Sequence, residues 1–381
     1  MASRRQFMAL IGGGVVVAAG AGGYVWASTR DPVKARAPWR LAGSQGEDPR
    51  LKALSYAVLA PNSHNRQPWL ADMSVPDEVT LYCQADRRLP ETDPYDRQIT
   101  IGLGCFLELM DQAAAQDGYR LDTALFPDGE PQPRLDDRPV ARVRFVRDEQ
   151  TPGDPLFAYI LERRSNKEPY DTARDVSTQD LERMAVVARS GRVGFTNEPA
   201  RVAMLREKAW AAMEVEMHTP ATLKESIDLV RVGRAEIEAN PDGIELSGPM
   251  FELLSMTGLM TRDSMLDTSS TAFKQQMKAM RAPFDTAMAF AWQVSAGNSR
   301  ADQIAAGRDY VRLNLAATGA GLSMQPFSQA LQEFPEMRDH YADLRDTLSV
   351  AADETIQMYF RLGYGKAVKP SPRWPVQTRL L

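Results

Sequence analysis

A stretch at 60–69, APNSHNRQPW, holds the residues best suited to binding a polar ligand. It gathers amide and hydroxyl side chains between a predicted helix and a predicted strand, and it ends in a proline and an indole. Several donors and acceptors on one rigid loop can hydrogen-bond the edge of a heteroaromatic ring and a polyol chain. On its own, the same composition also fits a turn stabilised by asparagine side chains.

A second stretch at 161–170, LERRSNKEPY, combines cations with a hydroxyl group. Arg163, Ser165 and Lys167 occupy alternating positions. Two cations beside a hydroxyl suit a phosphate and a ring carbonyl, because guanidinium and ammonium groups form charge-assisted hydrogen bonds to oxygen. A basic helix end taken alone is more often a solvated terminus, so the case for a ligand depends on both stretches together.

Together the two stretches resemble signatures of the nitroreductase-like flavoproteins. The first is similar to P-S-x-x-N-x-Q-P-W and departs from it only at Asn62, and the second is similar to R-x-S-x-[RK]. Two weaker matches follow in the family's order: GAGLSMQPF at 319–327 resembles the strand that leads to the flavin's reactive edge, and LGY with SPR at 362–373 resembles the last strand and phosphate-binding tail. The resemblance covers nearly all of the chain beyond about residue 49. It is closest to the Acg-type proteins that bind flavin mononucleotide (FMN), which look like a fused nitroreductase dimer.

The resemblance implies an FMN site. Arg163 and Arg373 are expected at the phosphate, Ser165 at the phosphate or ribityl end, and Lys167 beside the N1–C2=O edge, where a cation stabilises the reduced ring. Ser371 stands where relatives often carry a lysine, so its phosphate contact is in doubt. The other expected contacts are Pro61, Asn62, Ser63, Asn65 and Gln67 on the first loop, and Pro326, Phe327, Ser328 and Gln329 beside the flavin N5.

The distribution of the motifs predicts one complete site per chain. The opening helix of the first half, LKALS at 51–55, lacks Arg-x-Ser, and the second half has no second amide-rich loop. The implied activity is that of an FMN-dependent oxidoreductase that reduces a small flat acceptor, nitroaromatic or quinone, through flavin N5, without a catalytic residue of the protein. The alternatives are an FMN-binding or sequestering protein with a lid-covered flavin, and a structural periplasmic protein with a decayed site. The electron donor is not indicated.

Hydrophobic periodicity predicts an α+β chain built twice. The first half is predicted to contain helices at 48–59 and 99–115 and strands at 79–84, 120–126 and 140–146. The second half is predicted to contain helices at 155–164, 178–189, 200–218, 223–239 and 300–317, and strands at 193–196, 286–294, 321–324 and 355–362. With the resemblance, this order predicts a duplicated nitroreductase-like fold, with mixed or antiparallel sheets flanked by helices.

The predicted organisation is a leader at 1–27, a linker at 28–47, a first half at 48–150 and a second half at 151–381. Within the second half, about 241–283 is an insertion with no counterpart in the first half. It is rich in methionine, at positions 250, 256, 260, 265, 277 and 280. Flexible methionine side chains suit either a lid over a site or helices that fill a core, and the sequence leaves both open.

Residues 1–27 are typical of a twin-arginine export signal. Arg4 and Arg5 precede an apolar run rich in Gly, Ala and Val, which ends in VWA, a pattern typical of a cleavage site. This route carries folded proteins, so we expect periplasmic export with a cofactor already bound. Because the run is close to spanning length, an uncleaved membrane anchor is the alternative.

Composition limits the other functional classes. The formal net charge is −5, and the chain without its leader carries −7, which argues against a nucleic-acid groove or a basic membrane-binding face. The three histidines, His64, His218 and His340, are far apart in sequence, which argues against a zinc site. Cys83 and Cys105 either form a bridge or stay two buried thiols. We expect a monomer that acts as an internal pseudo-dimer, with no membrane span once the leader is removed.

Overall fold

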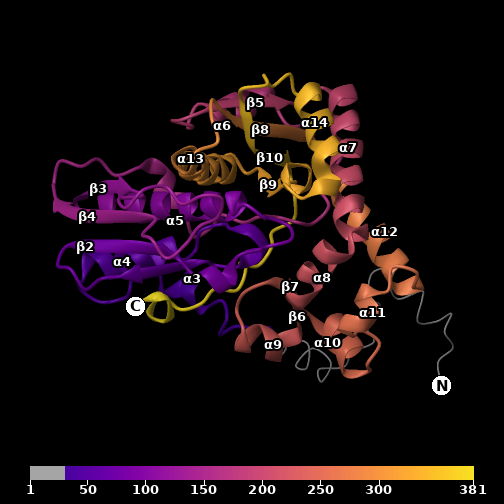
Figure 1. Ribbon diagram of the computed structural model, residues 1–381, viewed down its shortest axis with the longest axis horizontal. Coiled ribbons are helices and arrows are strands. Elements are labelled where there is room, and N and C mark those ends of the chain that lie inside the picture. The colour runs from indigo at the N-terminus through magenta and orange to yellow at the C-terminus, as the bar shows by residue number, and fades with distance from the viewer. Residues whose placement is uncertain (1–30) are drawn as a thin grey trace.

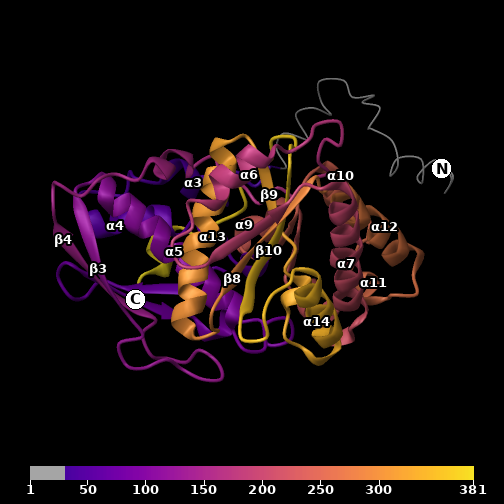
Figure 2. The ribbon, with the colours of Figure 1, turned by 90° about the horizontal axis from the view of Figure 1, so that it is seen from above.

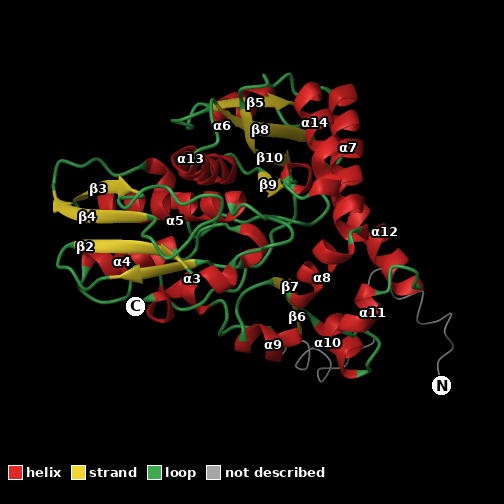
Figure 3. Ribbon diagram, in the orientation of Figure 1, coloured by secondary structure: helices red, strands yellow, loops and turns green. Residues whose placement is uncertain are grey.

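The computed structural model describes residues 31–381 and contains two antiparallel sheets, two long helices between them and a third, helical region (Figures 1 and 3). The predicted leader lies outside the described residues. No helix within 31–381 combines the length and hydropathy needed to cross a bilayer. The α+β class is confirmed, and both larger sheets are antiparallel throughout.

The first half forms a four-stranded sheet in the order β1-β2-β4-β3. The helix that leads to the amide-rich loop starts at Pro49, where proline needs no backbone donor, and the Asp48 carboxylate accepts a hydrogen bond from Arg50 N. Its elements are α3 (Ala37–Leu41), α4 (Pro49–Ala57), β1 (Trp69–Asp72), β2 (Glu78–Cys83), α5 (Arg97–Gln116), β3 (Tyr119–Leu125) and β4 (Ala141–Arg147).

The second half repeats this plan with the order β5-β8-β10-β9. The two orders correspond strand by strand, with β1 matching β5, β2 matching β8, β4 matching β10 and β3 matching β9. The elements of this plan are the 3-10 helix η3 (Pro155–Tyr159), α6 (Thr178–Ala185), β5 (Arg192–Thr196), β8 (Ala289–Ser295), α13 (Arg300–Gly319), β9 (Ser323–Pro326) and β10 (Thr355–Gly363).

The two halves meet where α5 and α13 cross (Figure 2). A Cβ at Gly104 would lie 2.2 Å from the Ile304 carbonyl oxygen, and a Cβ at Gly307 would lie 2.0 Å from the Ile101 carbonyl oxygen. The two glycines are each the eighth residue of their helix, and the two isoleucines are each the fifth. The crossing is therefore reciprocal, and only glycine permits so close an approach of the two backbones.

A helical insertion separates β5 from β8, where the first half has only the short connection between β1 and β2. It occupies about 197–288 and is thus wider than the predicted 241–283. The helix predicted at 223–239 is interrupted by a strand. The elements are α7 (Pro199–His218), α8 (Pro220–Asp228), β6 (Val230–Val232), α9 (Gly233–Ala239), β7 (Ile244–Leu246), α10 (Pro249–Met256), α11 (Arg262–Leu266) and α12 (Thr271–Asp285).

The methionines of the insertion fall into a buried group and an exposed group. Met265 and Met277 are buried with Phe273 in a second hydrophobic core that α7 and β8 share, as expected for core-filling helices. Met250 and Met256 on α10 are exposed, the latter by 71%. The core interpretation therefore holds for α11 and α12 and fails for the outer face of α10.

Two boundaries differ from the prediction. Part of the predicted linker is packed, because Trp39 on α3 is buried and its indole nitrogen donates to Ser371 O at 2.8 Å. The chain beyond β10 leaves the second half and runs back to the first, where Leu381 N donates to Ala71 O at 3.0 Å (Figure 1). Segments from both ends of the described chain thus lie together against the first half.

Several local predictions are also corrected. The helix predicted at 155–164 is only the short η3, while β1 and a helix α14 (Arg338–Thr347) were not predicted.

Cys83 and Cys105 are both buried and free, and burial raises the pKa of the Cys83 thiol to about 12. Within 31–381, no three His, Cys, Asp or Glu side chains gather as metal ligands would.

Substitution of either glycine at the helix crossing is expected to destabilise the protein. Gly104→Ala or Gly307→Ala should each lower the free energy of unfolding by about 1–3 kcal/mol, because the added methyl group forces the helices apart. Urea unfolding measures the change, and Ala320→Ser, which also adds one heavy atom but at an exposed position, is the control. Equal stabilities for all variants would contradict the close crossing.

Candidate functional site

Three arginines gather around the indole ring of Trp39. The guanidinium carbons of Arg163, Arg164 and Arg373 lie 5.7, 4.8 and 5.4 Å from the ring centroid. Arg163 and Arg373 are only 2% and 3% exposed. Arg163 and Arg164 follow η3, Arg373 lies in the C-terminal tail and Trp39 lies on α3, so three segments distant in sequence build this arginine cluster.

The two buried arginines are held by neutral oxygen atoms. Arg163 donates to Leu59 O at 3.1 Å and to Asn314 Oδ1 at 3.0 Å. Arg373 donates to Leu59 O at 3.1 Å, to Ala60 O at 3.0 Å and to Asn65 Oδ1 at 2.6 Å. Both motif arginines therefore converge on the backbone that leads into the amide-rich loop.

The two buried arginines of this cluster, Arg163 and Arg373, have no acid bonded to them among the described residues. Neither Arg163 nor Arg373 forms an ion pair there, and the Nε atoms of both are buried without a hydrogen-bond partner. Burial lowers the pKa of Arg163 to about 10, and burial followed by repulsion from Arg163 and Arg164 lowers the pKa of Arg373. Because a buried charge is costly unless it is paired, the cluster is suited to an anion.

The amide-rich loop is strained and tightly held. His64, Asn65 and Gln67 have φ angles of 46°, 52° and 51°, a left-handed conformation that is uncommon for residues other than glycine. Gln67 is fully buried, accepts from Trp374 N at 2.8 Å and donates to Pro241 O at 2.8 Å. The loop therefore has one shape, which the C-terminal tail and the insertion both help to fix.

Other side chains of the loop are bonded within the protein. Asn62 Oδ1 accepts from Gln67 N at 2.7 Å, and a Cβ at Gly102 would lie 3.0 Å from the Asn62 Cβ. Ser63 Oγ lies 3.2 Å from Gln98 Oε1, and Pro61 is buried. The amide of Asn62 thus shapes the loop, and that of Gln67 ties it to its neighbours.

Lys167 of the second motif lies close enough to His64 of the amide-rich loop for the two side chains to interact. Lys167 is exposed, yet the protein around it desolvates its ammonium group enough to lower its pKa, against the opposing charge of Glu245. Burial, followed by the charges of Lys167 and Arg66, lowers the pKa of His64 to about 4. The Lys167 ammonium is therefore close enough for its charge to act on the His64 ring, and His64 is neutral at pH 7.

The residues expected at the reactive edge lie partly elsewhere. Phe327 is buried in the second core and stacks on Phe284 with ring centroids 4.1 Å apart, while its N–H donates to Tyr359 O. Its side chain is therefore a core residue and does not line the site. Pro326 lies on β9, opposite Phe360 of β10.

The backbone on either side of β9 connects the second motif to the second core. Ser165 forms an isolated β-bridge with Met324 of β9. Ser328 precedes the 3-10 helix η4 (Gln329–Leu331), and Gln329 Oε1 is buried without a hydrogen-bond partner. Ser165 and Gln329 are therefore linked through one short strand.

The middle of the insertion, at 241–246, is fixed against the amide-rich loop. Gly243 N donates to Asn65 O at 3.3 Å. Asp242 accepts from Arg87 at 2.6 Å and from Arg231 at 3.0 Å. Burial opposes ionisation of Asp242, but these two arginines and Arg66 keep the pKa of its carboxyl below the usual value. Residues 241–246 thus cover the loop and are held there by a buried ionised carboxylate.

A second covering segment, 31–41, lies over the arginine cluster. Arg36 pairs with Asp31 and with Glu245, and its Nε donates to Pro370 O at 2.8 Å. Asp31 also pairs with Lys369 at 2.8 Å. These ion pairs tie the segment to the insertion on one side and to the C-terminal tail on the other.

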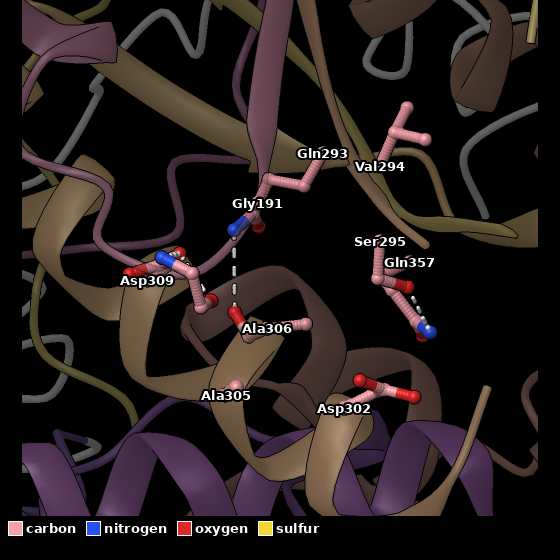
Figure 4. A pocket seen from close by; sticks show the side chains of 10 residues that line it. Gly191, Gln293, Val294, Ser295, Asp302, Ala305, Ala306, Asp309 and Gln357 are labelled. Atoms are coloured by element: carbon pink, nitrogen blue, oxygen red, sulfur yellow. Dashed lines mark hydrogen bonds between the residues drawn. The ribbon is translucent and has the colours of Figure 1, made fainter. Parts of the chain in front are cut away.

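A separate pocket in the second half contains none of the predicted site residues (Figure 4). It lies between β8, α13 and the turn that precedes β5, which corresponds in chain order to the amide-rich loop of the first half. Here Asp309 accepts from Arg189 N and Ser190 N, at 2.7 and 2.8 Å. A backbone turn closed by a carboxylate replaces the amide side chains, consistent with one complete motif set.

Sequence patterns did not reveal four residues that shape the site: Trp39, Leu59, Asn314 and Asp242. Leu59 acts through its carbonyl oxygen, which carries no side-chain signal. Trp39 and Asn314 belong to no recognisable motif and become neighbours of Arg163 only through the fold. Asp242 lies in an Asn-Pro-Asp-Gly run, which is typical of a turn and carries no signal for a buried carboxylate.

Comparison with known proteins gives partial matches. No protein-family model matches the chain. Over 140 residues, 37% of the chain, it is 31% identical to proteins from two strains of Mycobacterium tuberculosis, each named "Putative NAD(P)H nitroreductase". The chain spans about two fifths of the length of these curated relatives, 39% in each case.

Among solved structures, the chain is similar to the FMN-dependent nitroreductase NfnB of Mycobacterium smegmatis in complex with NADPH, at 20% identity over 57% of this chain and 92% of that one, with a TM-score of 0.35. It is also similar to a nitroreductase with bound FMN from Bacteroides fragilis, at 13% identity over 57% and 92%, with a TM-score of 0.32. Activity and cofactor are therefore proposals for this chain.

Loss of the Gln67 amide is expected to loosen the loop. Gln67→Leu, similar in size, leaves Trp374 N and Pro241 O without partners, and a buried unpaired polar group costs about 1–3 kcal/mol. Thermal unfolding should show the loss, with Gln377→Leu on the exposed face of the tail as the matched control. If both variants unfold together with the unsubstituted protein, Gln67 does not hold the loop.

Proposed function

We propose that the chain is an FMN-dependent oxidoreductase of the nitroreductase type, which passes reducing equivalents to a small flat acceptor such as a quinone or a nitroaromatic compound. The carrying observation is the buried arginine cluster, with two Nε atoms that lack partners and no carboxylate bonded to Arg163 or Arg373 within 31–381. Guanidinium groups bind phosphate oxygens through such donors. The residues present therefore fit the phosphate of FMN.

The chain's own residues would divide the work of binding. Arg163 and Arg373 hold the phosphate, and Asn65 keeps Arg373 in position. Lys167 supplies a positive charge beside the amide-rich loop, where it favours negative charge on a reduced ring. When bound, FMN supplies two-electron chemistry at its N5 atom.

We further propose one FMN per chain, bound by a monomer that is a fused nitroreductase-like dimer. The matching strand orders and the reciprocal crossing of α5 and α13 support the fused halves. A single arginine cluster beside a single amide-rich loop in 31–381 supports one site.

We also propose periplasmic export by the twin-arginine route, on the strength of the sequence of residues 1–27. The relatives' names mention NAD(P)H, and an exported chain would need another donor.

The covering segments favour a second candidate, an FMN-binding or sequestering protein with little turnover. Residues 241–246 are bonded to the amide-rich loop, and residues 31–41 lie over the arginine cluster. A cofactor enclosed in this way is retained well, while access for an acceptor is restricted. The two candidates predict the same cofactor and differ in turnover.

Purified protein is expected to carry one FMN per polypeptide and to reduce a soluble quinone when an artificial donor supplies electrons. Absorption spectroscopy, flavin release by denaturation and anaerobic stopped-flow measurements test these points in turn. Bound FMN that is reduced but never reoxidised by any small acceptor would favour sequestration. Protein that binds no FMN would overturn both candidates.

Arg163→Ala is expected to weaken FMN binding about 10- to 100-fold. A charge-assisted hydrogen bond is worth about 1.5–3 kcal/mol, and about 1.4 kcal/mol corresponds to a factor of ten in affinity. Fluorescence titration of the apoprotein with FMN measures the effect, and Arg183→Ala on the exposed face of α6 is the control.

Riboflavin, which lacks the phosphate, provides the second comparison for this variant. If Arg163 grips the phosphate, Arg163→Ala should leave riboflavin affinity nearly unchanged. An equal loss for FMN and riboflavin would mean that the substitution only disturbs the fold around Leu59.

A further inference from the structure

A buried acid, Glu216, lies on α7 behind the amide-rich loop. It is 4% exposed, and no arginine or lysine is bonded to it within 31–381. Its Oε2 accepts from Gln332 Nε2 at 3.0 Å, and its Oε1 lies 3.4 Å from Ser226 Oγ. A buried carboxyl with only neutral partners holds a proton more readily than an exposed one.

A chain of polar atoms leads from this acid to the loop. Ser226 Oγ on α8 lies 3.3 Å from His64 Nε2, and Glu216 Oε1 lies 4.0 Å from the same nitrogen. The His64 side chain is 16% exposed. The chain of polar atoms therefore begins inside the protein and ends at a partly accessible ring. His64 belongs to the loop that carries Asn65 and Gln67.

The groups around Glu216 and His64 set the protonation of both side chains. Burial raises the pKa of Glu216 to about 7; hydrogen bonds from Gln332, Gln329 and Ser226 oppose this rise, and the charge of Glu225 adds to it. Lys167 and Arg66 are the charged groups that face His64, and its ring is neutral above pH 5. Near neutral pH this chain of polar atoms therefore connects Glu216, which is still partly protonated, to a nitrogen of the His64 ring that can accept a proton.

We propose that Glu216, Ser226 and His64 form a proton path that supplies the proton required when the acceptor is reduced. This inference rests on the proposed function. A quinone that receives two electrons and one hydrogen from the reduced cofactor becomes an anion, and its oxygen must then take up one proton. Glu216 gives its proton to Ser226 Oγ as the serine gives its own to His64 Nε2, and the ring passes its other proton toward the acceptor. Solvent then reprotonates Glu216, and the partly exposed ring returns to the tautomer that can accept at Nε2 by exchanging its proton with solvent.

The path gives a buried acid a use that packing alone does not. A purely structural carboxyl would be replaced by glutamine with little kinetic effect, because the amide keeps the size and its oxygen still accepts a hydrogen bond. Proton transfer by a positioned group contributes about 10²- to 10⁴-fold to a rate, and its loss changes the pH dependence as well as the rate. The two roles therefore differ in measurable ways.

Glu216→Gln is expected to slow reoxidation of the reduced holoprotein by a soluble quinone about 100-fold at pH 6. In the unsubstituted protein the rate should fall as pH rises through about 7, since deprotonated Glu216 has nothing to give. In the variant this fall should be absent. Stopped-flow absorbance from pH 5 to 9 measures both effects, with Glu214→Gln, an exposed acid on the same helix, as the control.

Ser226→Ala separates the path from the acid itself. It should slow reoxidation as Glu216→Gln does, yet leave the infrared band of a protonated carboxyl, titrating near neutral pH, in the apoprotein. The part of that band that belongs to Glu216 should be missing in Glu216→Gln, while Asp93, a buried carboxyl whose pKa burial also raises to about 7, keeps its own part. The infrared measurement needs no cofactor and no turnover, so it reports on the acid independently of the proposed function.

The outcomes are distinct. Unchanged pH dependence in Glu216→Gln, or normal rates in Ser226→Ala, would overturn the path while the oxidoreductase proposal stands. Absence of quinone reduction in the unsubstituted protein would overturn both. The slow, pH-independent variant together with the retained infrared band in Ser226→Ala would support the path.

Discussion

Arg163 and Arg373 both donate to the carbonyl oxygen of Leu59, and this shared acceptor holds two distant segments against the start of the amide-rich loop. The contact places two guanidinium groups side by side in a buried position without an acid bonded to either. Such an arrangement is unfavourable unless an anion or dense hydrogen bonding compensates. The rest of the site supplies that compensation in part, through Asn65, Asn314 and the ring of Trp39.

The same constraint explains why the loop is so heavily reinforced. A left-handed backbone at His64, Asn65 and Gln67 costs free energy, which the bonds of Gln67 to the tail and to the insertion offset. Polar contacts also link the insertion to the loop, because Ser226, which contacts Glu216 in the insertion, also contacts His64 in the loop. A change of protonation at Glu216 can therefore reach the amide-rich loop through Ser226 and His64.

Long periodic segments were predicted well from sequence, and contacts between distant segments were not. α5 and α13 were predicted to within two residues at each end. In α5 the apolar Leu103, Leu107 and Met110 recur with helical spacing, although burial is almost continuous along both helices. The four-residue β1 is too short to show a period, and Val230–Val232 breaks a pattern that otherwise suits a helix. Motif residues such as Arg163 and Arg373 could be proposed from their chemistry. Trp39 and Asn314 could not, since only tertiary packing places them beside those arginines.

The order of the contributing residues along the chain has a consequence for biosynthesis. The arginine cluster combines Trp39 near the beginning of the described chain with Arg373 close to its end. Translation proceeds from the N-terminus, so Leu59 and Arg163 emerge from the ribosome well before Arg373 does. A partly synthesised chain can fold its first sheet but still lacks one of the two buried cations. Because Arg373 follows β10, the arginine cluster becomes complete only after every strand of the second sheet has been synthesised.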